Sequence, residues 1–192
     1  LLVARDGQVL YRKAVGKLDP TLATPMPVDG LFRVYSMTKP IVSVAAMQLI
    51  EQGQMALGDP VSKHLPELLG LQVGVEKPGA DGKPTLVLEP ARREMTVQDL
   101  MRHTSGLTNG VFGKSLVKGE YLKANMRPGD DAVEFDNAEL VRRVGKLPLA
   151  YQPGSTWDYS ISTDMLGALV EKVGGQRLDA LLQQRILGPL GM

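Results

Sequence analysis

Apolar positions spaced three and four residues apart mark the strongest predicted helices of this chain. The clearest helix runs from about Ser36 to Gln52, and Gly53 supplies a C-terminal stop signal. Its apolar stripe consists of Ile41, Val44, Ala45 and Leu49. Pro40 falls in the first turn, where backbone N–H groups lack helical partners, so the helix tolerates it.

Capping residues predict further helices. Thr96 is a typical N-cap for a helix that continues through Arg102. Asp136 and Glu139 have the spacing of a capping box, which predicts a helix to about Gly145. Other helical segments, short or amphipathic, are expected at about 60–69, 162–173 and 178–186.

Strand signals gather at the N-terminus. Asp6-Gly7 separates two β-prone runs and accepts the positive φ angles of a tight turn, which predicts a hairpin over residues 1–15. Residues 31–35 are expected to be a short strand or an extended lead-in, and 74–84 a surface excursion that could form a hairpin. Strands first and helices afterwards indicate an α+β fold rather than alternating βαβ units.

This order also suggests a domain organisation. We expect residues 1–35 to be N-terminal strands of a sheet region and residues 36–192 to be a helical region. Because two or three strands make a poor sheet by themselves, we expect further strands beyond residue 192 to complete it. Without them, we expect residues 1–192 alone to be catalytically incompetent.

Composition narrows the possible functions. The 192 residues are 43% hydrophobic and 22% charged, as in ordinary globular proteins, and the net charge of +1 gives no reason to expect nucleic acid as a partner. No apolar run is long enough to span a membrane. With no cysteine and two histidines, neither a metal site nor a cofactor is expected. This composition is compatible with both a cytoplasmic and a secreted location, and it leaves the oligomeric state open.

Ser36-Met37-Thr38-Lys39 is the first candidate for chemistry. Residues three apart share one face of a helix, so the Ser36 hydroxyl and the Lys39 amine can approach each other. A serine hydroxyl is a weak nucleophile until a base takes its proton, and a neutral lysine can be that base. The alternative is that Ser36 is only a helix N-cap. A second Ser-x-x-Lys at 115–118 leads into Gly119, in a stretch expected to be a glycine-containing loop.

Tyr159 is the second candidate, because it precedes a predicted helix and a phenol beside an ammonium relays protons more readily than a free one. The alternative is a tyrosine that only packs at a helix entry. His103 and Ser105 do not form a convincing catalytic pair, because residues two apart at a helix end do not face each other. They are expected to form a turn stabilised by local side-chain bonds.

Together these elements resemble the β-lactamase-like serine hydrolases, which include class C β-lactamases, D-alanyl-D-alanine carboxypeptidases, family VIII carboxylesterases and related acyltransferases. The resemblance covers nearly the whole chain and rests on six motifs in the family's order. These are Ser36-Met37-Thr38-Lys39-Pro40, residues 53–65, Leu100-Met101-Arg102-His103-Thr104-Ser105-Gly106-Leu107, Tyr151-Gln152-Pro153-Gly154, Tyr159-Ser160 and Pro189-Leu190-Gly191-Met192.

The resemblance implies a β-lactamase/transpeptidase-like fold, in which a helical region packs on an antiparallel sheet with the site between them. It implies that Ser36 is acylated, that Lys39 activates it and that Tyr159 shuttles protons. The backbone N–H of Ser36 would be one oxyanion donor, and a late strand with a Lys-Thr-Gly-like motif, absent from residues 1–192, would supply the other.

One departure bears on the substrate. β-Lactamases usually carry Asn two positions after the tyrosine, where its amide holds the acylamino side chain, whereas this chain has Ile161. This departure favours an ester over a lactam as substrate. We expect Ile161, Ser160 and Trp157 to lie beside the substrate, although the favoured interpretation of Trp157 taken alone is a packing anchor. The predicted function is a carboxylesterase acting on a small ester or amide. The alternatives are a β-lactamase, a D-alanyl-D-alanine carboxypeptidase, an acyltransferase and a non-catalytic binding module of the same fold.

Overall fold

The computed structural model describes residues 1–126 and 135–192, and the chain divides into two compact units, Leu1–Tyr35 and Ser36–Met192. In the first unit, strands β1 (Leu2–Arg5) and β2 (Gln8–Arg12) pair antiparallel. The turn between them uses Asp6 at φ 50° and Gly7 at φ 75°, which confirms the predicted hairpin. Residues 31–34 have no regular secondary structure and are an irregular lead-in to the second unit.

The second unit is mainly helical. A 3₁₀ turn, η1 (Tyr35–Met37), runs directly into helix α1 (Thr38–Glu51), close to the predicted 36–52. The predicted segment at 60–69 consists of two 3₁₀ turns. The remaining helical elements are η2 (Val61–Lys63), η3 (Pro66–Leu68), α2 (Val97–Arg102), α3 (Leu116–Lys123), α4 (Asn137–Val144), α5 (Ser162–Gly174), α6 (Leu178–Leu182) and the π-helical turn η4 (Gln183–Leu187).

The helix caps follow the predictions with two corrections, at α4 and at α3. Thr96 and Asp99 form a reciprocal capping box at the start of α2. Asp136 accepts the Glu139 N–H at the start of α4, whereas the Glu139 side chain pairs with Arg143. The prediction of a loop at 115–118 is wrong. Ser115 is the N-cap of α3 and its hydroxyl accepts the Lys118 N–H, which compensates for Gly119 inside the helix.

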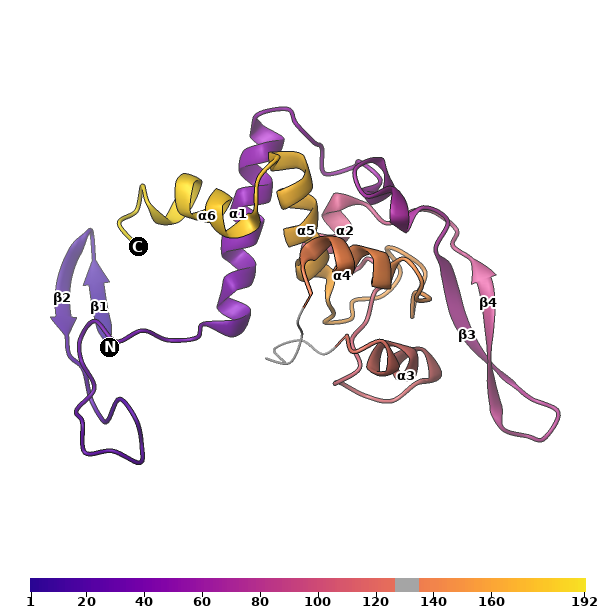
Figure 1. Ribbon diagram of the computed structural model, residues 1–192, viewed down its shortest axis with the longest axis horizontal. Helices are drawn as coiled ribbons and strands as arrows, with labels where there is room; N and C mark the ends of the chain where they lie inside the picture. The colour runs from indigo at the N-terminus through magenta and orange to yellow at the C-terminus, as the bar shows by residue number, and fades with distance from the viewer. Residues whose placement is uncertain (127–134) are drawn as a thin grey trace. The chain divides into compact units, whose positions relative to one another are not determined.

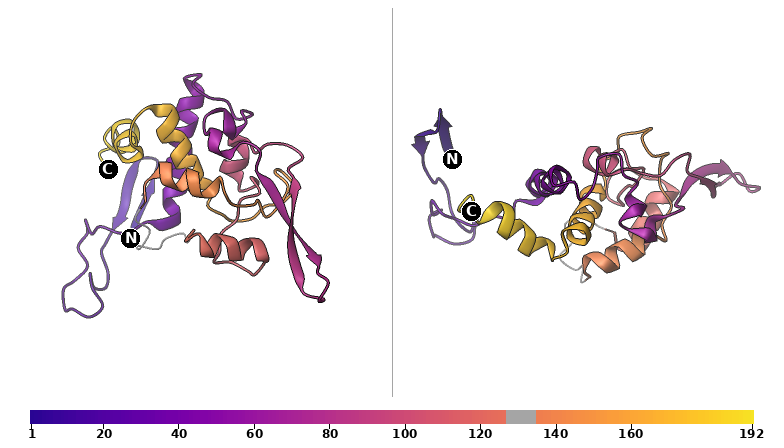
Figure 2. Two further views of the ribbon diagram at one scale, coloured as in Figure 1. Left: turned by 45° about the vertical axis from the view of Figure 1, so that its right-hand side comes forward. Right: turned by 90° about the horizontal axis from the view of Figure 1, so that it is seen from above.

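The excursion predicted at 74–84 is a longer hairpin. Strands β3 (Gln72–Pro78) and β4 (Pro84–Pro90) pair antiparallel over their whole length. Three views show this hairpin as an arm that extends away from the helices of its unit (Figures 1 and 2). The arm is anchored at its base, where the Gly74 N–H donates to the Leu149 carbonyl and the Leu149 N–H donates to the Gln72 carbonyl.

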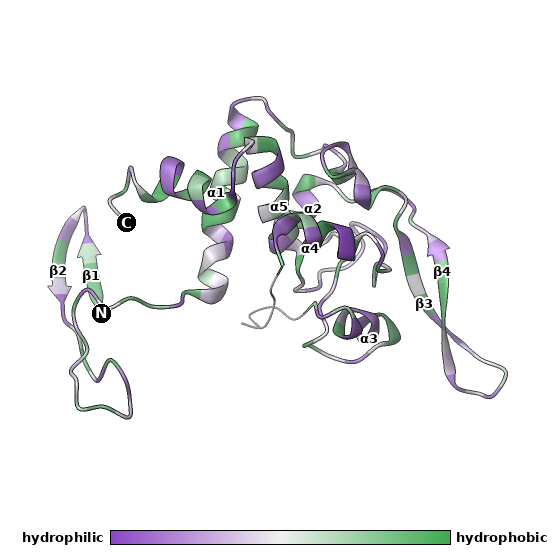
Figure 3. Cartoon of the chain, viewed as in Figure 1, coloured by the Kyte–Doolittle hydropathy of each residue, from purple (hydrophilic) through white to green (hydrophobic). Residues whose placement is uncertain are grey.

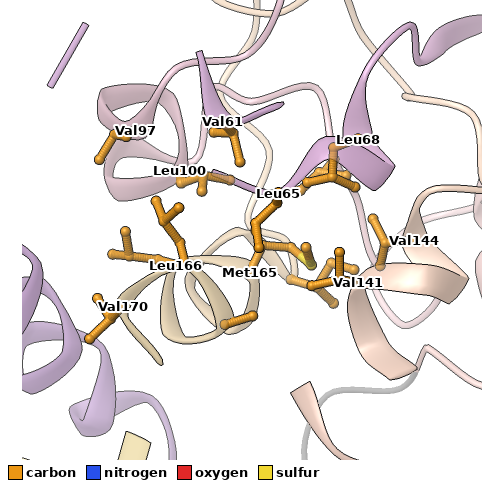
Figure 4. Close-up of a cluster of buried hydrophobic side chains, with 14 of the residues drawn as sticks. Val61, Leu65, Leu68, Val97, Leu100, Val141, Val144, Met165, Leu166 and Val170 are labelled. Atoms are coloured by element: carbon orange, nitrogen blue, oxygen red, sulfur yellow. The ribbon is translucent and has the colours of Figure 1, made fainter. Parts of the chain in front are cut away.

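Helix α5 is the centre of the hydrophobic core, because it contacts α1, α2, α4 and α6. Met165 and Leu166 are fully buried, and they face the side chains of Leu100 and Val141 (Figure 4). Figure 3 shows hydrophobic and hydrophilic residues alternating along α1, as expected for a helix with one buried face. Truncating a buried side chain of this size typically costs about 2–5 kcal/mol of unfolding free energy. This packing holds α5 in the core, and α5 in turn holds the segment just before it.

Candidate active site

Ser36 and Lys39 lie on the same side of the turn that begins α1. The Lys39 side-chain nitrogen donates a hydrogen bond to the Ser36 hydroxyl, with an Nζ–Oγ distance of 3.3 Å. Ser36 is exposed and Lys39 is half-buried. The N-cap residue of α1 is Met37, which makes no side-chain cap bond. Ser36 therefore does not act as the helix N-cap, and its hydroxyl is directed to Lys39 instead.

The Tyr159 hydroxyl completes this group from a distant part of the chain. Its oxygen lies 2.5 Å from the Ser36 hydroxyl oxygen, and the Lys39 Nζ lies 4.8 Å from the centre of the Tyr159 ring. The hydrogen bonds with Lys39 and Ser36 lower the pKa of Tyr159 from its ordinary value. The three side chains thus form one hydrogen-bonded group in which protons can pass between a hydroxyl, an amine and a phenol.

The residues on either side of Tyr159 are held by His103. His103 is the C-cap of α2 in the left-handed conformation, at φ 58°. Its carbonyl accepts the Asp158 N–H at 3.0 Å, and its Nδ1 accepts the Ser160 N–H at 3.2 Å. The His103 ring also stacks on the Tyr159 ring, with centroids 4.8 Å apart. Burial lowers the pKa of His103, and the positive charge of Lys39 lowers it further.

The loop over residues 108–112 supports Tyr159 as well. The Asn109 side-chain amide donates to the Tyr159 carbonyl, and its oxygen accepts the N–H groups of Val111 and Phe112. The Phe112 ring meets the Tyr159 ring edge to face, with centroids 6.1 Å apart. Sequence reasoning missed His103 and Asn109, although the motif around His103 was part of the resemblance, because these contacts join segments far apart in the chain.

Lys118 closes this loop. Its ammonium donates to the Phe112 carbonyl and lies 3.7 Å from an Asp158 carboxylate oxygen, which also accepts a 2.6 Å hydrogen bond from the Thr108 hydroxyl. Lys118 is only 9% exposed, so this pair holds its charge inside the protein. The second Ser-x-x-Lys motif is therefore structural: Ser115 caps a helix and Lys118 fixes a loop.

The three residues expected beside the substrate have different environments. Trp157 is 65% exposed, and its ring lies 6.4 Å from the Tyr159 ring. Ser160 is buried, and its hydroxyl bonds to Ser162 at 2.6 Å. Ile161 is 3% exposed and belongs to the hydrophobic core. Trp157 is thus the one of the three that presents its side chain at the surface near Tyr159. Substrate contact by each of the three stays a prediction.

His103 and Ser105 form no catalytic pair. The Ser105 hydroxyl is buried and bonds to the Ser162 hydroxyl at 2.8 Å, while the His103 Nδ1 faces Ser160. Within residues 1–126 and 135–192, no cluster of three or more His, Cys, Asp or Glu side chains could hold a metal ion. In the same part of the chain, no helix combines the length and apolar character needed to cross a membrane.

The sequence matches the family model of the beta-lactamases over residues 1–192, so the chain belongs to the beta-lactamase family. The structure has the β-lactamase/transpeptidase-like fold. It superimposes with a TM-score of 0.82 on EstCE1, a hydrolase with promiscuous acyltransferase activity, at 31% identity over all of this chain and 46% of that one.

Two curated relatives have sequences similar to this chain. Esterase EstB of Burkholderia gladioli is 40% identical over 195 residues, which are 100% of this chain and 44% of that protein. Acyltransferase calJ of Penicillium decumbens is 34% identical over 189 residues, or 97% of this chain and 42% of that protein. The chain thus spans less than half the length of these relatives.

Proposed function

We propose that this chain carries the nucleophile, base and proton relay of a serine hydrolase that works through an acyl-enzyme, with small carboxylic esters as substrates. The observation that carries the proposal is the position of the Ser36 hydroxyl, 3.3 Å from the Lys39 amine and 2.5 Å from the Tyr159 hydroxyl. A nucleophile within hydrogen-bonding reach of a base, with a further titratable group beside them, is the arrangement that activates a serine.

In the proposed acylation step, neutral Lys39 takes the Ser36 proton while the Ser36 oxygen bonds to the ester carbonyl carbon. The carbonyl π electrons move to oxygen, and the resulting oxyanion accepts a hydrogen bond from the Ser36 N–H. When the tetrahedral intermediate collapses, the bond to the alkoxide breaks. The proton passes from Lys39 through Tyr159 to the departing oxygen, so that an alcohol leaves and acyl-Ser36 remains.

Deacylation reverses these roles. Tyr159 and Lys39 take a proton from water, the resulting hydroxide attacks the acyl carbon, and the bond between that carbon and the Ser36 oxygen breaks. The proton returns to Ser36, which regenerates the free hydroxyl and releases the carboxylic acid. If an alcohol replaces water in this step, the product is a new ester. The same three residues therefore support hydrolysis and acyl transfer.

The preference for esters rests on the position two residues after Tyr159. Ile161 offers no amide to hold the acylamino group of a lactam or a peptide, so this proposal ranks β-lactamase and D-alanyl-D-alanine carboxypeptidase activity below ester hydrolysis. The names of the relatives EstB and calJ favour an esterase or an acyltransferase. Intact Ser36, Lys39 and Tyr159 argue against a non-catalytic binding module. We further propose that exposed Trp157 forms an apolar wall for the substrate.

The test is hydrolysis of p-nitrophenyl butyrate by the protein as it is encoded, with whatever sequence flanks residues 1–192. We expect turnover that Ser36→Ala abolishes. Adding a small alcohol should produce a butyrate ester in competition with butyric acid if acyl transfer also occurs. Equal turnover by the wild-type protein and Ser36→Ala would overturn the proposal.

A further inference from the structure

His103 contacts Tyr159 and the residues directly before and after it. Its backbone carbonyl binds the residue before Tyr159, because the Asp158 N–H donates to it at 3.0 Å. Its ring binds the residue after Tyr159, because the Ser160 N–H donates to Nδ1 at 3.2 Å. Its ring face lies against the tyrosine ring, with centroids 4.8 Å apart and an angle of 32° between the planes. We call these three contacts the His103 clamp.

Backbone hydrogen bonds place the clamp at the end of α2. His103 ends α2, and its N–H bonds to carbonyls of Asp99 and Leu100. Its left-handed backbone at φ 58° turns the chain sharply after the helix, which brings carbonyl and ring to the same segment, 158–160. A non-glycine residue in this conformation carries strain that the surrounding contacts must offset, and such residues concentrate near functional sites.

The clamp also specifies one form of the imidazole. Because Nδ1 accepts the Ser160 N–H, the proton of the neutral ring is on Nε2. A ring with a proton on Nδ1 would present a donor to a donor and lose the bond to Ser160. The neighbouring charges that act on the ring are those of Lys39 and Asp158. Asparagine is the conservative replacement, since its side-chain oxygen can take the place of Nδ1 and it tolerates the left-handed conformation better than most residues.

We infer that His103 is a positioning residue for Tyr159. The contacts made by His103 hold the Tyr159 phenol where its hydroxyl reaches Ser36. This inference rests on the proposed function, in which Tyr159 delivers a proton to the departing alkoxide. A displacement of about 1 Å can cost on the order of 100-fold in rate, so loosening the phenol should have a visible effect. The effect should depend on the leaving group, because an alkoxide needs a proton to depart and p-nitrophenolate does not.

The kinetic test compares kcat/KM, which reports acylation, for ethyl butyrate and p-nitrophenyl butyrate. His103→Ala should lower kcat/KM at least about 10-fold for ethyl butyrate and much less for p-nitrophenyl butyrate. His103→Asn should recover part of the loss, and it also serves if His103→Ala folds poorly. In a Tyr159→Phe background, His103→Ala should cost little more. Equal losses on the two esters, or full additivity with Tyr159→Phe, would overturn the inference.

His64 provides the matched control. It is the other histidine of the chain, it follows η2 directly, and its ring bonds to Asp59 at 3.3 Å. His64→Ala should leave the ratio of the two kcat/KM values unchanged.

A second readout does not depend on ester turnover. The Lys39 and Ser36 bonds lower the pKa of Tyr159, so a loosened phenol should titrate closer to its ordinary value. Carbon-13 NMR of ζ-labelled tyrosine should show this rise in His103→Ala and not in His64→Ala. A Tyr159 titration that is unchanged in His103→Ala would overturn the positioning role. Inactive wild-type protein with the expected titration change would instead contradict the proposed function.

Discussion

The hydroxyl oxygens of Ser36 and Tyr159 lie 2.5 Å apart, although 123 positions separate them in the sequence. The serine belongs to the turn before α1, and the tyrosine to the segment before α5. Because α1 and α5 pack against each other, the core of the second unit brings the starts of both helices together. The candidate site is thus a consequence of helix packing.

The first prediction concerns which serine is acylated. A fluorophosphonate probe should label Ser36, because its hydroxyl is exposed and bonded to Lys39. Ser115→Ala is the control: it removes the α3 cap and should cost about 1 kcal/mol of stability without abolishing labelling. Peptide mapping that places the adduct on Ser115 would contradict the assignment.

The second prediction is that Lys39 and Tyr159 act as a unit. Lys39→Ala and Tyr159→Phe should each lower kcat by at least about 100-fold, the usual scale for the loss of a general acid or base. The double variant should be little worse than the poorer single variant, because both residues belong to one proton path. Turnover close to that of the wild type in Tyr159→Phe would remove the tyrosine from the mechanism.

The third prediction is a preference for esters over lactams. The kcat/KM for p-nitrophenyl butyrate should exceed that for a chromogenic cephalosporin, because Ile161 supplies no amide for the acylamino group. Ile161→Asn tests the reason for the preference, although a buried amide without partners should also cost stability, about 1–3 kcal/mol. A wild-type protein that prefers the cephalosporin would reverse this ranking.

The fourth prediction concerns stability in acid. Burial disfavours the charged form of Asp99, but hydrogen bonds from Arg93, Thr96 and Thr104 outweigh it and hold the pKa of Asp99 at about 2, below the usual 3.8. The carboxylate therefore contributes about 2 kcal/mol, fully present above pH 3.8 and lost as the pH falls toward 2.

Urea unfolding between pH 7 and pH 2 measures this contribution. The stability difference between the wild-type protein and Asp99→Asn should be largest near neutral pH and should shrink below pH 3.8. Asp81→Asn, at an exposed carboxylate in the turn of the β3–β4 hairpin, is the control and should show a smaller difference. A difference for Asp99→Asn that does not change with pH would contradict the prediction.

The fifth prediction separates a steric clash from backbone strain. Gly106 and Gly82 both have positive φ, 85° and 76°, but a Cβ on Gly106 would collide with the Tyr151 carbonyl, whereas one on Gly82 meets nothing. Gly82→Ala should cost about 1–2 kcal/mol from strain alone, and Gly106→Ala about 2–5 kcal/mol because overpacking adds to it. Urea unfolding of both variants gives the comparison, and equal losses would remove the clash as a cause.

The local features of this protein could be predicted from residues within one helical turn. Lys39 reaches Ser36 because three residues make almost one helical turn, and Thr96 caps α2 because its side chain bonds a backbone N–H three residues later. These contacts depend on the backbone repeat and on the residue types within one turn. The prediction of a loop at 115–118 was wrong for a local reason as well. It gave more weight to Gly119, a residue unfavourable inside helices, than to Ser115, which caps α3.

Which distant segments meet could not be predicted in this way, because it depends on the packing of the helices. Sequence motifs suggested Tyr159, but its distance from Ser36 follows from the packing of α1 against α5. The packing of α2 against α5 sets His103 against Tyr159, and the core of the second unit buries Ile161. Neither result is visible in the residues around each position. The physical reason is that hydrophobic burial is nondirectional: it favours a buried face on each helix, while the shapes of all the packed side chains together select which residues end up in contact.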